Sequence, residues 1–379
     1  MGYICHNGEA HAGIPELATF VQACAVPDAE APVRAARTRV TAASVACWDG
    51  GMDLLILGGT QWLGRTIAGE ALARGHRVTC LARGEAGDVA AGAELVRADR
   101  SAPGAYEEVA GRRWDAVVDV TRQPGFARRA AAELGPSAAH WTFISSGNVY
   151  ARHDEPGADE TAELMPPLES DESDPETYGE AKSAIEQDYR QAVGDRLLVI
   201  RPGLIVGPGD PSGRGGYWVA RAARDDGPML VPDILDSPVQ AIHLDDLVRF
   251  TLDAIERRLT GAFNAVGDRV SFEDWLDQSR SIAGHTGEVV AVSPEWLAEQ
   301  GVAEWSGPES LPLWIIDPDW QAFLDRSNAA AKAAGLRLRP LEQLLVEILE
   351  WERSQGLDRE RGAGLSAGRE RELLAALRC

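Results

Sequence analysis

The sequence predicts an α/β fold, in which helices cover both faces of a parallel sheet and a smaller C-terminal lobe follows. From Met52 onward, short apolar runs alternate with amphipathic segments, which is typical of strand–helix–strand units. The stretch LLILGGTQWLGRT, residues 54–66, places a buried strand, a glycine turn and the start of a helix in direct succession. The alternation loosens after Pro202, where RPGLIVGPGDPSGRGG leads into a mixed region. This change indicates the second lobe.

The alternation also predicts where the individual elements lie. Six apolar runs are expected to be strands: Asp53–Leu57, Arg77–Ala82, Glu94–Ala98, Asp115–Val120, His140–Ser145 and Arg196–Arg201. Helices are expected between them, beginning with Leu63–Arg74 and ending with Pro175–Val193. In the second lobe, apolar residues at helical spacing predict C-terminal helices, as in LEQLLVEILEW at residues 341–351.

The chain divides into three expected segments. Residues 1–51 have no sustained helix or strand period, and we interpret them as a disordered leader or a mis-assigned start, with Met52 as the natural first residue. A short helix around Pro15–Cys24 is the alternative. Residues 52–205 are expected to form the sheet domain, and residues 206–379 the smaller lobe with the C-terminal helices.

Composition and charge exclude several classes of function. The formal net charge of −22 repels polyanions and no run of Lys or Arg interrupts it, so nucleic acid is not an expected partner. No apolar run approaches the roughly 18 residues of a membrane-spanning helix, and no signal-peptide pattern is present. The sequence therefore predicts a cytoplasmic protein without a membrane partner. The five cysteines lack CxxC spacing and the seven histidines do not pair at metal-ligand spacing, so neither disulfides nor a metal site is expected.

The glycine turn predicts a phosphate-binding site. Gly58 allows a sharp turn after the strand, and Gly64 allows the new helix to pack against the sheet. Backbone N–H groups at the start of that helix can then bind a pyrophosphate. Residues 59–66 also spell G-x-x-x-x-G-R-T, close to the phosphate loop of nucleotide triphosphatases, but Arg65 replaces the lysine of that loop. The dinucleotide interpretation is therefore favoured.

A tyrosine and a lysine form a second motif. TYGEAKSAIE places Tyr178 and Lys182 four residues apart on an amphipathic helix, so both lie on one face. An ammonium near a phenol lowers the tyrosine pKa from about 10, which makes Tyr178 a candidate general acid or base. Earlier in the chain, FISSGNVY ends a buried strand in Ser145 and Ser146, at the edge where α/β proteins bind ligands. An exposed helix pair and two serines that cap a strand end are the alternatives.

Together, the glycine turn, the strand-end serine and Tyr-x-x-x-Lys resemble the short-chain dehydrogenase/reductase superfamily. SSGNVY and RPGLIVGPGD resemble its extended, epimerase/dehydratase-type branch. The resemblance implies a Rossmann-type, NAD(P)-binding domain at residues 52–205 and a substrate-binding lobe at 206–379. It also implies that Tyr178 is the catalytic acid/base, that Lys182 lowers the pKa of Tyr178 and holds the nicotinamide ribose, and that Ser146 hydrogen-bonds the substrate oxygen. Ser145 would then be structural.

Gln61 stands where the family's G-x-x-G-x-x-G turn has its middle glycine. The sequence GGTQWLG resembles a divergent group of the extended branch that has a polar side chain at this position. We expect Gln61 to hydrogen-bond the phosphates or the adenosine ribose; a solvent-facing side chain is the alternative. The resemblance implies a cofactor site formed by Gly58, Thr60, Gln61, Trp62, Leu63, Gly64, Arg83, Asp99, Val120, Lys182 and Pro202.

The expected cofactor is NADP, with NAD as the alternative. NAD-preferring members carry an acid at the end of the second strand to hold the ribose 2′-OH, whereas here VTCLARG has Ala82 followed by Arg83. An arginine suits a 2′-phosphate. Asp99 resembles the family's adenine-binding Asp, and a loop cap is its alternative role.

The positions after the strand-end serines bear on the reaction. Dehydratases of this branch carry Asp-Glu where this chain has Gly147 and Asn148, so elimination of water is disfavoured. Arg214, with Tyr217 and Trp218 shortly after it, suggests an anion clamp with a stacking surface. Trp218 could equally belong to the core. The residues expected near the substrate are Asn148, Arg214, Tyr217, Trp218 and His243.

The leading hypothesis is an NADP-dependent oxidoreductase, a ketone reductase or alcohol dehydrogenase, that acts on a sugar-like or other small polar metabolite. A nucleotide-sugar epimerase with a transient keto intermediate is the first alternative. A non-catalytic dinucleotide-sensing or RNA-associated protein on the same fold is the second, and the presence of both Tyr178 and Lys182 argues against it. The resemblance also implies a homodimer, because extended-branch enzymes commonly pair through two helices of the first domain.

Overall fold

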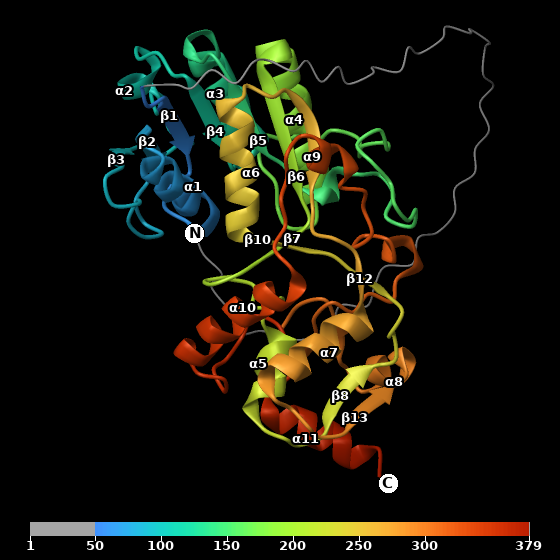
Figure 1. The fold of residues 1–379 in the computed structure, drawn as a ribbon. Helices are drawn as coiled ribbons and strands as arrows, with labels where there is room; N and C mark the ends of the chain where they lie inside the picture. The colour runs from blue at the N-terminus through green and yellow to red at the C-terminus, as the bar shows by residue number, and fades with distance from the viewer. Residues whose placement is uncertain (1–49, 379) are drawn as a thin grey trace, which may run out of the picture. The chain divides into compact units, whose positions relative to one another are not determined.

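The computed structural model of the protein describes residues 50–378 (Figure 1). A seven-stranded sheet has the strand order β11-β6-β5-β4-β1-β2-β3, and every neighbouring pair in it is parallel. Its strands are β1 (Asp53–Leu57), β2 (Arg77–Ala82), β3 (Glu94–Arg97), β4 (Ala116–Asp119), β5 (Trp141–Ile144), β6 (Leu197–Pro202) and β11 (Gly261–Ala265). The predicted fold class, a doubly wound parallel sheet, is confirmed.

Both faces of this sheet are covered by helices, because alternate residues of each strand point to opposite sides. In β1, Leu54 and Ile56 pack in one hydrophobic cluster with α1 and α6, while Leu55 and Leu57 pack in another with α3 and α4. Since both faces are covered, the central strands are mainly apolar, as Leu54–Leu57 of β1 shows. The covering helices are α1 (Trp62–Ala73), α6 (Leu244–Glu256), α3 (Pro124–Leu134) and α4 (Tyr178–Val193).

The predicted strands agree with this sheet. Asp53–Leu57 and Arg77–Ala82 match in full, and the other four differ by one residue at one or both ends. The sequence did not predict β11, which begins at a glycine and is only five residues long. Because β11 and α6 join the sheet layer, that layer extends beyond residue 205, while the division into two functional domains stays a prediction.

The C-terminal lobe has a hydrophobic core of its own. Helices α5 (Tyr217–Arg224), α7 (Phe272–Ala283) and α10 (Leu341–Gln355) pack against one another, and β8 (Met229–Pro232) pairs in parallel with β13 (Val289–Val292). The remaining elements are α2 (Glu107–Ala110), α8 (Pro294–Glu299), α9 (Ala329–Ala333), α11 (Ala367–Ala376), β7 (Leu204–Val206), β9 (Pro238–Val239), β10 (Ala241–His243), β12 (Val270–Ser271), β14 (Ala303–Glu304) and β15 (Ser310–Leu311).

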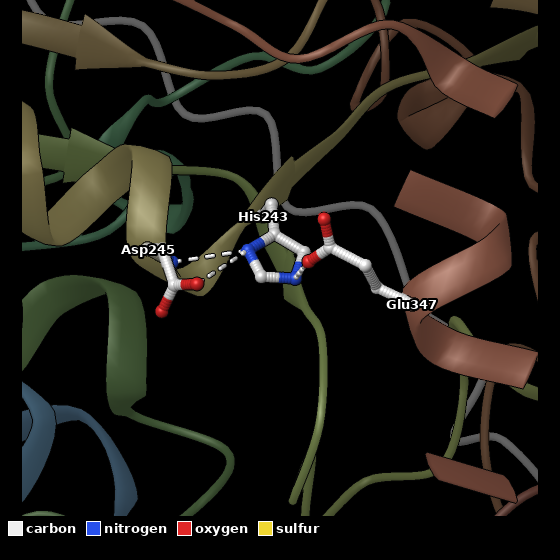
Figure 2. A group of neighbouring side chains, drawn as sticks. All are labelled: His243, Asp245 and Glu347. Atoms are coloured by element: carbon white, nitrogen blue, oxygen red, sulfur yellow. Dashed lines mark hydrogen bonds and ion pairs between the residues drawn. The ribbon is translucent and has the colours of Figure 1, made fainter. Parts of the chain in front are cut away.

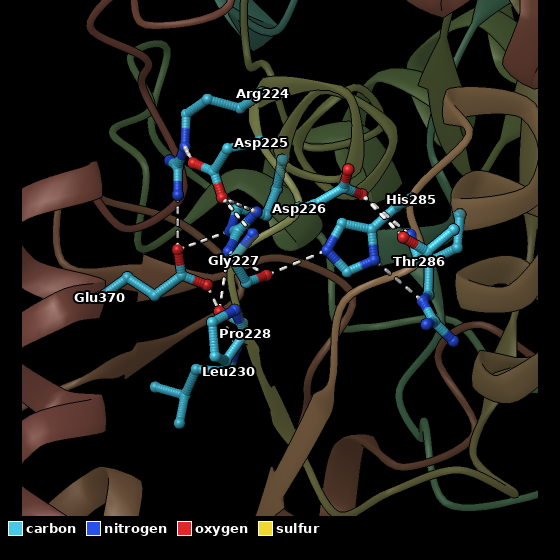
Figure 3. A network of polar contacts seen from close by, with 11 residues as sticks. Arg224, Asp225, Asp226, Gly227, Pro228, Leu230, His285, Thr286 and Glu370 are labelled. Carbon is cyan, nitrogen blue, oxygen red and sulfur yellow. Dashed lines mark hydrogen bonds and ion pairs between the residues drawn. The ribbon is translucent and has the colours of Figure 1, made fainter.

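A buried ionic junction fixes α11 to this lobe (Figure 3). One oxygen of Glu370 accepts hydrogen bonds from Arg221 Nε and Arg224 Nη2, both at 2.5 Å. Its other oxygen accepts the backbone N–H of Leu230 at 3.1 Å. Arg221 also donates to the Pro228 carbonyl at 2.8 Å. Both carboxylate oxygens of Glu370 are therefore used by donors of the protein.

Some sequence predictions concern residues that the structure does not describe. The leader or mis-assigned start at residues 1–51 lies, apart from Gly50 and Gly51, outside the described residues, as does the alternative helix at 15–24. Among the helices of residues 50–378, none combines the length and the apolar character needed to cross a lipid bilayer.

Candidate active site

The glycine turn between β1 and α1 leaves no room for side chains. Gly58 has a φ of 107°, and a Cβ there would lie 2.8 Å from Val120 Cγ2. A Cβ on Gly59 would lie 2.3 Å from Cys80 Sγ on β2. One on Gly64 would lie 2.3 Å from the carbonyl oxygen of the first glycine. The turn therefore holds the start of α1 close against the end of β1, as a pyrophosphate site requires.

Gln61 is the N-cap residue of α1. It has extended backbone angles, φ −99° and ψ 167°, and its exposed side chain makes no capping hydrogen bond. The N–H groups of the first helical turn are thus not satisfied by a side-chain cap, and they retain their partial positive charge. Thr60 is buried at the turn, while Trp62 and Leu63 are half-buried. A bond from Gln61 to a phosphate or ribose stays a prediction.

Charged side chains follow β2 and β3 at the carboxyl edge of the sheet. The side chain of Arg83 is 41% exposed and lies 3.4 Å from Glu85 in a surface ion pair. Asp99 accepts hydrogen bonds from the backbone N–H of Ser101 at 2.9 Å and from its hydroxyl at 2.7 Å. These bonds lower the pKa of Asp99, and the charge of Arg83 adds to the effect. Asp99 thus caps its own loop, which was the alternative role, and its contact with adenine stays a prediction.

Arg97 on β3 is a second cation at this edge that the sequence analysis did not identify. Gly84, directly after Arg83, has a φ of 78°, and a Cβ there would lie 2.0 Å from Arg97 Nη1. The strand pairing places Arg97 next to the end of β2, because Ala82 is its register partner. The sequence predicted strand β3 but not its register with β2, so it did not place Arg97 near Gly84.

The two strand-end serines have different surroundings. Ser145 is buried; its hydroxyl donates to Glu186 Oε1 at 2.7 Å. Arg201 binds the same carboxylate with two bonds, at 2.9 and 2.7 Å. The hydroxyl of Ser146 instead donates to Asn148 Oδ1 at 3.0 Å and accepts the Asn148 N–H at 3.2 Å. Ser145 is thus part of the core beneath the site, and Ser146 is the serine that faces it.

Tyr178 begins α4, and the side chain of Ser146 lies close enough to its phenol to favour the ionised form. Burial raises the pKa of Tyr178, while Ser146 and the charges of Arg122 and Arg214 oppose this rise. Lys182 is not among the groups that oppose this rise, and its predicted effect on the pKa of Tyr178 stays a prediction. The net shift is upward, and the cations that favour the phenolate are the two arginines.

Lys182 lies one turn further along α4, with its ammonium directed into the sheet edge. Nζ donates to the carbonyl oxygens of Thr121 at 2.7 Å and Ile144 at 2.8 Å, and it is 5.8 Å from the centre of the Tyr178 ring. Burial lowers the pKa of Lys182 to about 7, although the charge of Asp119 opposes this shift. A lysine with this pKa is neutral at the pH where the Tyr178 phenol ionises, so it adds no positive charge there.

The remaining predicted cofactor residues lie at the same edge. Val120 directly follows β4 and is half-buried, and its side chain lies next to Gly58. Pro202 is the buried last residue of β6. The middle of the edge thus has a tight glycine turn followed by the uncapped N–H groups of α1. Arginines lie beyond β2, and Tyr178 and Lys182 lie on α4. These residues fit a nicotinamide dinucleotide, with its pyrophosphate at the turn.

Of the substrate residues expected in the second lobe, some lie near Tyr178 and others lie in the core of the lobe. The guanidinium of Arg214 lies 4.6 Å from the centre of the Trp305 ring, and its charge acts on Tyr178. Tyr217 and Trp218 are 3% and 0% exposed and belong to the lobe core, where the Trp218 indole donates to the Pro312 carbonyl at 2.9 Å. The predicted stacking surface is therefore corrected to a core role, because α5 packs this face against α7.

His243, at the N-cap of α6, lies between Asp245 and Glu347 (Figure 2). Among residues 50–378, this group brings potential metal-ligand atoms within 4.8 Å of one another. Nδ1 accepts the Asp245 N–H at 3.1 Å, so the neutral ring carries its proton on Nε2, 3.3 Å from Glu347 Oε2. Neither nitrogen then offers a free lone pair to a metal, and Arg339 already pairs with Glu347. We interpret the group as an ion-pair junction between α6 and α10; a contact of His243 with substrate stays a prediction.

Fold and edge together define a class: a Rossmann-type protein built to bind a nicotinamide dinucleotide. A family model described as the NAD dependent epimerase/dehydratase family matches residues 127–265. This match bears out the resemblance found in the sequence: over residues 127–265 the chain is similar to this family. A search of curated proteins gave no match.

Similar solved structures come from several bacteria. A provisionally assigned epimerase from Burkholderia cenocepacia J2315 has a TM-score of 0.62 and 20% identity, over 80% of this chain and 99% of that chain. UDP-glucose 4-epimerase from Thermotoga maritima, solved with UDP-glucose, has a TM-score of 0.56 and 17% identity over the same shares. UDP-glucuronic acid 4-epimerase from Bacillus cereus, in complex with NAD, has a TM-score of 0.58 and 14% identity, again over 80% and 99%. At these identities the likeness concerns the fold.

Proposed function

We propose that this protein is an NADP-dependent oxidoreductase that interconverts a secondary alcohol and a ketone on a sugar-like or other small polar metabolite. The observation that carries the proposal is the placement of Ser146 next to Tyr178 at the carboxyl edge of the sheet, with Lys182 one turn further along α4. Hydroxyl, phenol and ammonium are the groups that proton transfer to and from a substrate oxygen needs.

Each of the three side chains has a distinct part in this chemistry. The dinucleotide supplies or accepts the hydride. Ser146 donates a hydrogen bond to the substrate oxygen, and Tyr178 transfers a proton to that oxygen during reduction. Because burial raises the pKa of Tyr178, the phenol keeps its proton near neutral pH and is ready to act as the acid. Lys182, buried between two strand ends, would hold the ribose next to the nicotinamide.

The preference for NADP rests on the cations beyond β2. Arg83 directly follows β2, the guanidinium of Arg97 lies next to Gly84, and no acidic residue directly follows β2 to hold a ribose 2′-OH. A 2′-phosphate would gain charge-assisted hydrogen bonds from a guanidinium here. Glu85 lies 3.4 Å from Arg83 and would have to give way.

The proposal is tested with the whole chain. Calorimetric titration with NADPH and NADH measures cofactor preference, and absorbance at the nicotinamide band then follows turnover on a panel of ketones and secondary alcohols. We expect tighter binding of NADPH and turnover that Tyr178→Phe abolishes. Binding of neither dinucleotide would overturn the proposal.

Epimerisation is the second candidate, favoured by the family match at residues 127–265. An epimerase returns the hydride to the same substrate, so it retains its cofactor and shows no net change in absorbance. Denaturing the purified protein and assaying the released dinucleotide separates the two candidates. Retained cofactor, with product formed from a nucleotide-linked sugar and no net oxidation, would support the epimerase.

A homodimer and a cytoplasmic location complete the proposal and rest on the sequence. Light scattering at micromolar concentration tests the first. Cell fractionation tests the second.

A further inference from the structure

The loop between β7 and α5, residues 207–216, is attached to the start of the cofactor helix through a tryptophan. The indole Nε1 of Trp62, the first residue of α1, donates to the Pro208 carbonyl at 2.8 Å, across 146 positions of the chain. A Cβ on Gly209 would lie 3.1 Å from the same Nε1. The loop backbone thus approaches the indole closely, and the φ of 82° at Gly209 also favours glycine there.

Hydrogen bonds within loop 207–216 hold its residues together, so a bond at one end of the loop can position the whole loop. The Asp210 carboxylate accepts the Ser212 N–H at 2.8 Å and its hydroxyl at 2.7 Å, and the Ser212 hydroxyl accepts the Arg214 N–H at 3.3 Å. Gly207 and Gly209 have φ values of 138° and 82°, angles that side chains rarely allow. The turn at the β7 end of the loop is therefore set by glycines.

We propose that Trp62 is a positioning residue: it fixes loop 207–216 against the glycine turn, so that the loop covers the bound dinucleotide and presents Arg214 to an anionic substrate. The inference rests on the proposed function, because Trp62 directly follows Gln61, whose neighbouring N–H groups would hold the pyrophosphate. Arg214 is held at the other end of the loop by stacking on Trp305, 4.6 Å from that ring. One hydrogen bond thus links the cofactor turn to the loop that carries the substrate cation.

Trp62→Phe tests this link, because it keeps an aromatic ring and removes the indole N–H; the smaller ring volume is the change that the control variant shares. The bond is exposed to solvent, so water can replace it and the variant is expected to fold. Trp296→Phe is the matched control, a half-buried tryptophan of α8 in the second lobe. Both variants and the wild type are titrated with NADPH by calorimetry, and the hydrogen exchange of amides 207–216 is measured with and without NADPH.

We expect NADPH to slow exchange of the loop amides in the wild type and in Trp296→Phe, and to slow it much less in Trp62→Phe. The dissociation constant for NADPH should rise about 3- to 10-fold in Trp62→Phe alone, the range of one lost hydrogen bond. Equal loop protection and equal affinity in all three proteins would overturn the inference and leave the proposed function intact. Failure of the wild type to bind NADPH would overturn both.

Discussion

The carboxyl edge of the sheet and the Glu370 junction of the C-terminal lobe use polar groups in opposite ways. At the junction, both oxygens of Glu370 are bound by Arg221, Arg224 and a backbone N–H, and the carboxylate is 2% exposed. At the edge, Ser146 has a short-range partner in Asn148, and Tyr178 has Ser146, with both facing the predicted ligand.

This difference separates stability from chemistry. A buried charge whose partners all come from the protein stabilises the fold, and removing one partner leaves the others uncompensated. Groups at a reactive site must instead keep capacity for a ligand that is not part of the chain. Substitutions at the two places should therefore affect different measurements.

The largest expected effect is on turnover. Tyr178→Phe removes the phenolic proton and should lower kcat about 10²- to 10⁴-fold, the usual contribution of a general acid. Its thermal midpoint should match that of the wild type, since the ring stays in place. Steady-state kinetics and scanning calorimetry of the same preparation measure both. A large loss of stability with normal turnover would show that Tyr178 serves the fold and not the reaction.

The second expected effect is on stability. Glu370→Gln keeps the shape of the side chain and removes its charge, so Arg221 and Arg224 lose their carboxylate. Breaking a buried pair costs about 3 to 5 kcal/mol. Urea unfolding should show this loss, while kcat per folded molecule stays unchanged. Glu372→Gln is the control, because the Glu372 side chain is 71% exposed; equal destabilisation by both would contradict the junction's role.

Lys182 should make stability depend on pH. Its folded-state pKa of about 7 lies below the value of about 10.4 in an unfolded chain. Between these values the unfolded chain binds more protons, so the free energy of unfolding rises with pH, by at most about 1.4 kcal/mol per unit. Lys182→Met should flatten this slope between pH 7 and 9. Lys332→Met, at an exposed lysine paired with Asp268, should leave it in place.

The smallest expected effect is on cofactor choice. Arg83→Ala should weaken NADPH binding about 3- to 10-fold and leave NADH binding unchanged, because one partly exposed cation is removed. Calorimetric titration of both dinucleotides measures the change. Arg113→Ala, at an exposed residue before β4, is the control. An equal loss for both dinucleotides would show that Arg83 does not read the 2′-phosphate.

The sequence predicted the sheet layer well because its signals are local. Unbroken apolar runs gave β1 and β2 to the residue, and the glycine spacing gave the turn. Contacts between distant residues were not predictable in the same way. The pair of Arg97 with Gly84 depends on strand register, and the Trp62–Pro208 bond joins residues 146 positions apart.

The direction in which a side chain points was the other source of error. Tyr178 and Lys182 were correctly placed on one helix, but the sequence did not show that Lys182 Nζ donates to the carbonyls of Thr121 and Ile144. Tyr217 and Trp218 look like a binding surface in the sequence because aromatic residues serve binding and core packing equally. Only the packing of α5 on α7 decides between these roles.

The late position of β11 has a consequence for how the chain is made. Strand β6 can pair with β11 only after Ala265 has been synthesised, and α9 adds Ala331 to the same hydrophobic cluster as α1 and α6. A nascent chain that ends at residue 205 would thus expose the edge of β6 and the uncovered face of β1. The sheet layer therefore cannot be completed before Ala265 has been synthesised, by which point helices α5 and α6 have already been made.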